Sequence, residues 1–124
     1  MVAADDTAAE AWVAAVIEGG AEGFVPDLVY AETANALGGY VRGGELAEDD
    51  ARTKLSLIVE LPLRVASLRS LSLDALGKSL ELGLSVYDAC YVVLADAADA
   101  TLVTADRRLA AAVPRAAVLP DVHP

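Results

Sequence analysis

Cysteine and histidine are almost absent from this chain of 124 residues, which has only Cys90 and His123. A single cysteine excludes an intramolecular disulfide, and a domain of this length can bury a stable core without a disulfide cross-link. This usage favours a reducing cytoplasm. No basic residue or histidine lies near Cys90 in the sequence, so we interpret it as a small buried helix residue rather than a nucleophile.

Long hydrophobic runs are also missing. No apolar run approaches the ~20 residues that a membrane span needs, and residues 1–6 lack the basic and apolar regions of a signal peptide. Hydrophobic residues nevertheless make up 56% of the chain, which excludes a disordered or low-complexity protein. We therefore expect one folded domain over residues 1–124.

Basic residues are scarce. Nine Lys and Arg face 19 Asp and Glu, so the net charge is -10. A chain this acidic repels nucleic acid, which counts against a simple electrostatic nucleic-acid binder. It does not exclude a nuclease whose acidic site recruits divalent cations. The simpler interpretation is that most of these charges keep the surface solvated.

Helical stretches alternate with short apolar runs along the chain. Thr7 has capping-box spacing to Glu10 and is expected to begin a first helix that ends at Gly19, and Asp27 is expected to cap the second helix. The other expected helices cover residues 28–40, 46–61, 73–82, 85–98 and 107–113, and the expected strands cover residues 23–26, 63–68, 101–104 and 116–119. This alternation predicts an α/β fold with a parallel sheet covered by helices. Ligands bind such sheets beyond the carboxyl ends of the strands.

Three acidic residues have unusual positions. Glu32 lies inside a largely apolar helical segment, with Asn35 three residues later on the same face. Asp88 is the only charged residue between Glu81 and Asp96. Asp106 follows an expected strand, where a parallel sheet would deliver a side chain to a site.

Carboxylates that converge are costly unless a cation neutralises them. Mg²⁺ or Mn²⁺ takes oxygen ligands, activates water and neutralises charge on a phosphate, so the three acids suggest a metal-dependent phosphodiesterase. Each acid also has a structural interpretation. Glu32 is equally well an exposed helix carboxylate, and Asp88 is equally well a helix cap. Taken alone, Asp106 is better explained as the cap of the final helix than as a site residue.

The three segments together resemble the PIN-domain family, and within it the VapC-type toxins. Residues 25–37 are similar to the segment with that family's second acidic residue. Residues 83–91 are similar to its S-x-Y-D-A-x-Y helix, and residues 102–109 to its T-x-D strand end. The resemblance covers nearly the whole chain, and it implies a three-layer α/β/α fold with a central parallel sheet.

The resemblance also implies a function. Glu32, Asp88 and Asp106 match the acidic metal-site positions, which are also the catalytic ones, and Thr104 and Asn35 match polar residues that support the site. The family implies Mg²⁺ or Mn²⁺ as cofactor and RNA cleavage by metal-activated water. VapC-type proteins further imply a VapB-like antitoxin as partner and a homodimer.

One part of the family pattern is absent from this sequence. Members open with a short apolar strand that ends in the first metal-site Asp, whereas Asp5 and Asp6 here directly precede a helix and are interpreted as residues at its N-terminus. We therefore expect a domain that lacks its first strand, either because the start codon was assigned too late or because the strand has been lost.

The missing Asp suggests an alternative function, a catalytically impaired PIN-fold scaffold that binds proteins. A PIN-like enzyme acting on DNA or in RNA maturation has less support.

Overall fold

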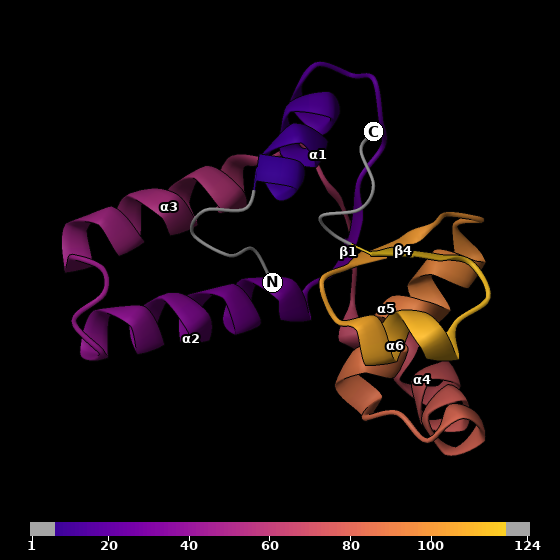
Figure 1. Cartoon of the computed structure of the whole chain (residues 1–124). Helices are drawn as coiled ribbons and strands as arrows, with labels where there is room; N and C mark the ends of the chain where they lie inside the picture. The colour runs from indigo at the N-terminus through magenta and orange to yellow at the C-terminus, as the bar shows by residue number, and fades with distance from the viewer. Residues whose placement is uncertain (1–6, 119–124) are drawn as a thin grey trace.

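The computed structural model describes residues 7–118, with the side chains of residues 11–116. This part of the chain forms six helices and four strands, with one or two helices between successive strands (Figure 1). In order they are α1 (Thr7–Ile17), β1 (Phe24–Pro26), α2 (Leu28–Arg42), α3 (Glu48–Glu60), β2 (Arg64–Ala66), α4 (Leu68–Leu82), α5 (Val86–Ala97), β3 (Leu102–Thr104), α6 (Arg107–Ala112) and β4 (Ala116–Val118).

The strands pair in parallel, as the sequence predicted. β1 lies beside β2 with Phe24 opposite Arg64, and β3 lies beside β4 with Leu102 opposite Ala116. Within residues 7–118 these pairs form two separate two-stranded sheets rather than one continuous central sheet. Parallel strands require long crossover connections, and the helices between the paired strands provide them.

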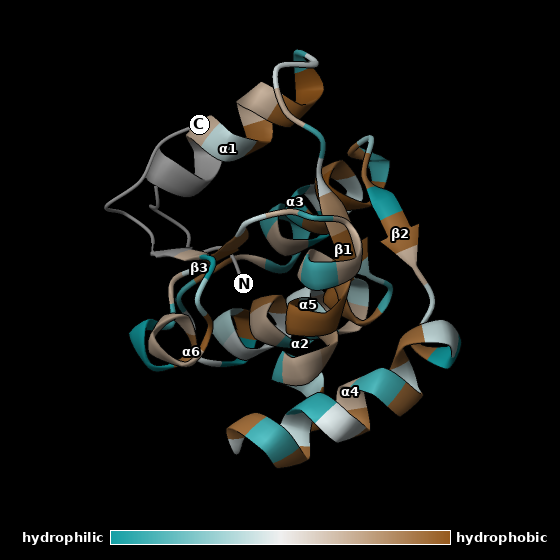
Figure 2. Cartoon of the chain, turned by 90° about the vertical axis from the view of Figure 1, so that its right-hand side faces the viewer, coloured by the Kyte–Doolittle hydropathy of each residue, from teal (hydrophilic) through white to brown (hydrophobic). Residues whose placement is uncertain are grey.

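Helix α5 joins the two halves of the protein. Its sequence is apolar on most sides, and it lies near the centre of the molecule with β1 and β3 on either side (Figure 2). Two core clusters contain residues of this helix. The first comprises Leu71, Ala75, Ala89, Cys90, Val93 and Leu94, packed against Phe24, Ala66 and Leu68; the second comprises Val92, Leu102, Leu109 and Val113. Burying a Val or Leu side chain stabilises the fold by about 1.5–3 kcal/mol, so α5 is a major source of stability for both halves.

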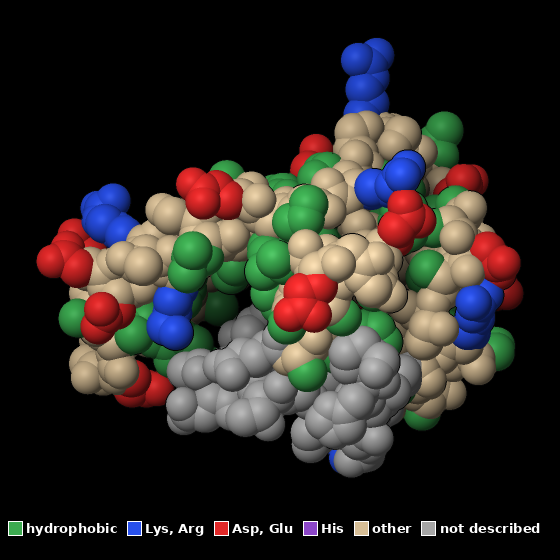
Figure 3. Space-filling view, turned by 90° about the horizontal axis from the view of Figure 1, so that it is seen from above, with side chains coloured by type: hydrophobic (Ala, Val, Ile, Leu, Met, Phe, Trp, Pro, Cys, Tyr) green, Lys and Arg blue, Asp and Glu red, His purple; other side chains and the backbone are tan. Residues whose placement is uncertain are grey.

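Charged side chains are dispersed over the surface. Figure 3 shows acidic side chains spread over the upper face, with Lys and Arg side chains among them. Some form exposed ion pairs, such as Arg64 with Glu22 at 2.8 Å. Exposed pairs of this kind contribute between 0 and about 1 kcal/mol, so they do not determine the fold.

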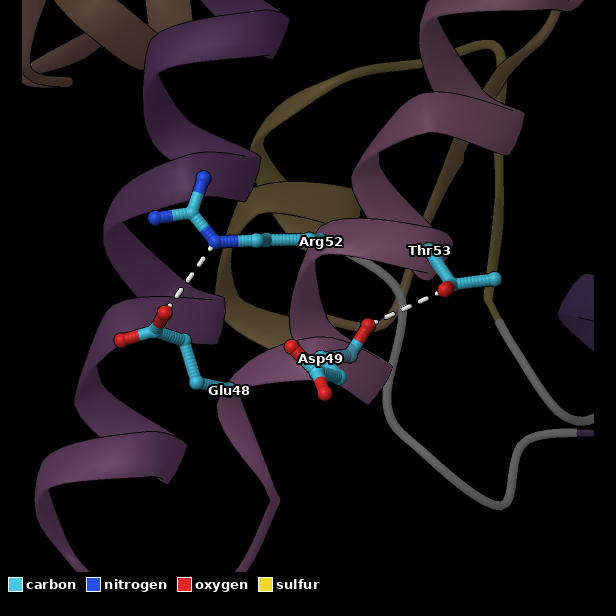
Figure 4. A network of polar contacts seen from close by, with 4 residues as sticks. All are labelled: Glu48, Asp49, Arg52 and Thr53. Atoms are coloured by element: carbon cyan, nitrogen blue, oxygen red, sulfur yellow. Dashed lines mark hydrogen bonds and ion pairs between the residues drawn. The ribbon is translucent and has the colours of Figure 1, made fainter.

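Helices α2 and α3 form a hairpin that projects from the rest of the protein (Figure 1). Ala51 of α3 is buried, and three acidic residues occupy the first turn of that helix, where the helix dipole favours them. Figure 4 shows two hydrogen bonds within the N-terminal part of α3. Arg52 donates to the carboxylate of Glu48 at 3.2 Å, and Thr53 Oγ1 donates to the carbonyl of Asp49 at 3.0 Å.

The start of α4 lies five residues earlier than predicted. Ser67 Oγ accepts a hydrogen bond from the Ser70 amide at 3.1 Å, so Ser67 is the N-cap and the helix begins at Leu68. The predicted strand over residues 63–68 is accordingly shortened to Arg64–Ala66. At the other end, Gly83 adopts a left-handed conformation with φ of 69°, which ends the helix as predicted.

The predicted capping role of Asp27 is wrong. Asp27 occupies the N-cap position of α2, but its side chain makes no capping hydrogen bond there. Its Oδ1 instead accepts from the amide of Leu68, at 3.1 Å, and thereby satisfies a free N–H at the start of α4. Asp5, Asp6 and the side chain of Thr7 lie outside the described part, so their predicted roles remain predictions.

Among the described residues, no helix has the length and apolar character needed to cross a membrane.

Candidate metal and phosphate site

A pocket of about 290 Å³ lies where the end of α4 meets the starts of α5 and α6. It is lined by Leu82, Gly83, Leu84, Ser85, Asp88, Asp106, Arg108, Leu109 and Ala112. Two of the three predicted acidic residues, Asp88 and Asp106, therefore open onto the same pocket, together with the cationic side chain of Arg108.

Asp88 is placed by the first turn of α5. The N-cap of that helix is Ser85, whose Oγ accepts a hydrogen bond from the Asp88 amide at 3.1 Å. The alternative interpretation of Asp88 as the helix cap is therefore wrong. Because Ser85 performs the capping, the Asp88 carboxylate is not needed for it. This carboxylate lies in the first turn of α5, at the positive end of the helix dipole.

Asp106 is placed by the end of β3, and it does cap α6. Its Oδ1 accepts from the amides of Arg108 at 2.9 Å and Leu109 at 3.2 Å, which confirms the capping interpretation. The Asp106 amide donates to Thr104 Oγ1 at 3.0 Å, so Thr104 fixes the turn that carries the carboxylate. Both capping bonds use the same oxygen, so capping and binding a cation through Oδ2 are compatible.

Glu32 is linked to α5 by a hydrogen bond. Its carboxylate, on the exposed side of α2, accepts from the Tyr91 hydroxyl. Tyr91 follows Asp88 by three residues, so both lie on one side of α5. Burial, together with the hydrogen bond to Glu32, raises the pKa of Tyr91, which keeps the hydroxyl protonated as a donor. Asn35 is exposed one turn after Glu32 and does not line the pocket.

The carboxylates of this pocket suit a cation that keeps several water ligands better than one whose ligands all come from the protein. Within residues 7–118, no group of three or more His, Cys, Asp and Glu side chains is close enough to hold an ion. Mg²⁺, however, keeps several waters and takes only one or two protein carboxylates in many sites. Asp88 and Asp106 match that requirement, while Glu32 is connected through Tyr91 rather than placed in the same pocket.

Sequence reasoning missed two residues of this region. It assigned no role at the site to Tyr91, although the spacing of three residues from Asp88 was visible in the sequence. It also gave Ser85 no capping role, although a serine three residues before Asp88 is a common N-cap arrangement. The interpretation of Cys90 is confirmed: its side chain is 3% exposed, and burial, with Glu32 and Asp27 nearby, raises the pKa of the thiol.

Comparison with known proteins agrees with this fold. The chain belongs to the PIN-domain family, whose model matches residues 2–113. Among individual proteins, it is 41% identical to ribonuclease VapC3 of Pyrobaculum aerophilum over 90 residues, which are 71% of this chain and 69% of that protein.

A solved structure supports the same conclusion. The chain superposes on the crystal structure of PAE2754 from Pyrobaculum aerophilum with a TM-score of 0.72 and 25% identity, covering 94% of this chain and 87% of that one. The resemblance to VapC-type PIN domains and the predicted α/β fold are therefore confirmed.

Proposed function

We propose that this chain is a Mg²⁺- or Mn²⁺-dependent endoribonuclease of the VapC type, built as one PIN domain over residues 1–124. The observation that carries the proposal is that Asp88 and Asp106, far apart in the sequence, line one pocket. The 41% identity to a ribonuclease supports RNA as the substrate.

The residues of the pocket have distinct roles in this proposal. Asp88 and Asp106 hold the cation, and Thr104 orients Asp106 through its backbone amide. When bound, the ion supplies an activated water and neutralises charge on the phosphate. Arg108, in the same pocket, offers a second positive charge to an RNA phosphate.

Glu32 is the third catalytic acid in this proposal. Tyr91 holds its carboxylate on the side of α5 that carries Asp88. Asn35, one helical turn further along α2, supports Glu32 from the same face. A carboxylate held in this way adds negative charge on the side of α5 that carries Asp88 and avoids the cost of burial, because Glu32 stays exposed.

The proposed setting is the cytoplasm, with a VapB-like antitoxin and a second copy of the chain as protein partners. A net charge of -10 makes control by a partner with a basic segment electrostatically favourable. The same charge disfavours indiscriminate binding of RNA, so the cation at the site is needed for productive binding.

Calorimetric titration of the full chain with Mn²⁺ tests the proposal, with Asp88→Asn as the matched variant. Asn preserves the size of the side chain, and the capping bond from the Asp88 amide to Ser85 is unaffected. We expect binding and RNA cleavage in the wild type and loss of both in the variant, with an unchanged circular dichroism spectrum. Equal cleavage by Asp88→Asn would refute the assignment.

The second candidate is a PIN-fold scaffold with impaired catalysis that binds a protein partner. It is favoured by the lack of a three-carboxylate cluster within residues 7–118. It predicts negligible Mn²⁺ binding together with stable association with a VapB-like helix. Robust metal-dependent cleavage by the purified chain would exclude it.

A further inference from the structure

Exposed aromatic side chains are rare in this protein. Its one Trp, four Tyr and one Phe all lie within the described residues, and only Tyr87 among them is exposed, at 64%. The other aromatic residues are partly buried, and their rings contribute to packing. The ring of Tyr87 buries little surface, so the stability of the fold does not explain an aromatic residue at this position.

The hydroxyl of Tyr87 does not explain the residue either. Within the described part of the chain, this hydroxyl makes no hydrogen bond. The hydroxyl of Tyr91, one turn further along α5, donates to Glu32 and so connects two helices. Tyr87 therefore offers an exposed ring that no contact within the described residues holds in place.

Tyr87 lies beside the proposed metal site. It immediately precedes Asp88 in the first turn of α5. Tyr91 follows it by four residues, so both tyrosines lie on one side of the helix. Tyr87 itself does not line the pocket of Asp88 and Asp106. A ring in this position is suited to contact the nucleotide next to a bound phosphate rather than the phosphate itself.

The charge of the protein makes an uncharged contact with RNA important. A net charge of -10 repels the phosphate backbone, and Arg108 is the single cationic residue among those that line the pocket. Stacking of a base on an aromatic ring does not depend on the net charge of the protein. It also accepts every base, because each base has a π face.

We infer that the ring of Tyr87 stacks on the base of the nucleotide next to the phosphate held at Asp88 and Asp106. The inference rests on the proposed ribonuclease function and names the residue that contacts a base at that site. The contact requires a base that is unpaired and can leave its own stack. Tyr87 acts in binding and not in the cleavage step.

Equilibrium binding of two short fluorescein-labelled RNA probes to the full chain with Mn²⁺ tests the stacking. Both probes have phosphorothioate linkages, which keep the backbone charge and resist hydrolysis. One probe carries all its bases and the other is abasic, so the two differ in stacking at equal charge. We expect the wild type to bind the abasic probe about tenfold more weakly, and Tyr87→Ala to bind both probes with the same weak affinity.

Two matched variants serve as controls. Tyr87→Phe keeps the ring, so it should distinguish the probes as the wild type does. Val86→Ala shortens the neighbouring side chain, which is 39% exposed, and should also behave as the wild type. Circular dichroism should show the same fold in every variant, because Tyr87 is exposed. The Mn²⁺ affinity should also be unchanged, which separates a loss of stacking from damage to the metal site.

Steady-state cleavage of unmodified RNA gives a second readout. Tyr87→Ala should raise KM about tenfold and leave kcat unchanged, because the ring binds substrate and transition state equally. A wild type that neither binds nor cleaves RNA would overturn both the ribonuclease proposal and the stacking. A base preference that depends on Tyr87 in a chain without cleavage would support the stacking and refute the ribonuclease. Equal binding of the two probes by the wild type, or an undiminished preference in Tyr87→Ala, would overturn the stacking alone.

Discussion

The hydroxyl of Tyr91 donates a hydrogen bond to the carboxylate of Glu32, joining residues that are 59 positions apart in the chain. The bond connects α2 with the turn of α5 that follows Asp88. It turns an exposed helix carboxylate into one with a defined position relative to the pocket. A hydrogen bond from a neutral donor to a charged acceptor is among the stronger ones in proteins.

Removing this hydroxyl should weaken the metal site without unfolding the protein. We expect Tyr91→Phe to lower Mn²⁺ affinity about tenfold, because residues that orient metal ligands typically have effects of that size. The stability change should be no more than about 1 kcal/mol, since Glu32 is exposed. Calorimetry and thermal unfolding measure the two effects. Tyr87→Phe is the control, because Tyr87 is on the same helix and 64% exposed, and an equal loss of affinity in that variant would contradict the role of Tyr91.

Two substitutions at Asp106 should separate its structural role from its charge. Asp106→Ala removes the cap of α6 and should cost about 1 kcal/mol of unfolding free energy. Asn is an equally good N-cap, so Asp106→Asn should keep the stability and still lose Mn²⁺ affinity. Urea unfolding and calorimetry give the two quantities. If Asn destabilised the protein as much as Ala, the capping interaction would not be the source of the stability.

Asp27 should stabilise the fold through the start of α4. Asp27→Ala leaves the Leu68 amide without its acceptor, and we expect a loss of about 1–2 kcal/mol in urea unfolding. Asp27→Asn keeps an acceptor oxygen and should lose less than half of that. If the two variants proved equally destabilised, the charge of Asp27 rather than its hydrogen bond would be responsible.

The thiol of Cys90 should be unreactive in the folded protein. Its side chain is 3% exposed, and burial raises the pKa of the thiol, so little reactive thiolate is present at neutral pH. Ellman's reagent should modify it only at the rate of unfolding. Ser72→Cys adds an exposed thiol on α4 as an internal standard, and modification of both thiols at the same rate would contradict the buried position.

The order of helices and strands could be predicted because glycines, prolines and apolar spacing mark the ends of most elements. The prediction was least accurate where short polar residues decide a boundary. The residues between Ala66 and Leu73 include three serines, and the sequence does not show which of them caps a helix. In the structure, the hydrogen bond from the Ser70 amide selects Ser67.

The acidic residues of the site could be identified from the sequence, but their connections could not. Asp88 and Asp106 were recognised by their positions relative to a helix and a strand, which are local features. Glu32 is linked to the site by Tyr91, and Asp27 binds the Leu68 amide 41 residues away. Both contacts depend on how the elements pack, which local periodicity does not encode.

Val92 and Val93 are neighbours in the chain, yet Val92 belongs to the core of the β3–β4 half and Val93 to the core of the β1–β2 half. Helix α5 cannot turn or shift without loosening both cores at once. We therefore expect the two halves to melt in a single transition, although their strands do not pair with each other. The amides of α5 should be the last to exchange with solvent, and only when the whole domain opens.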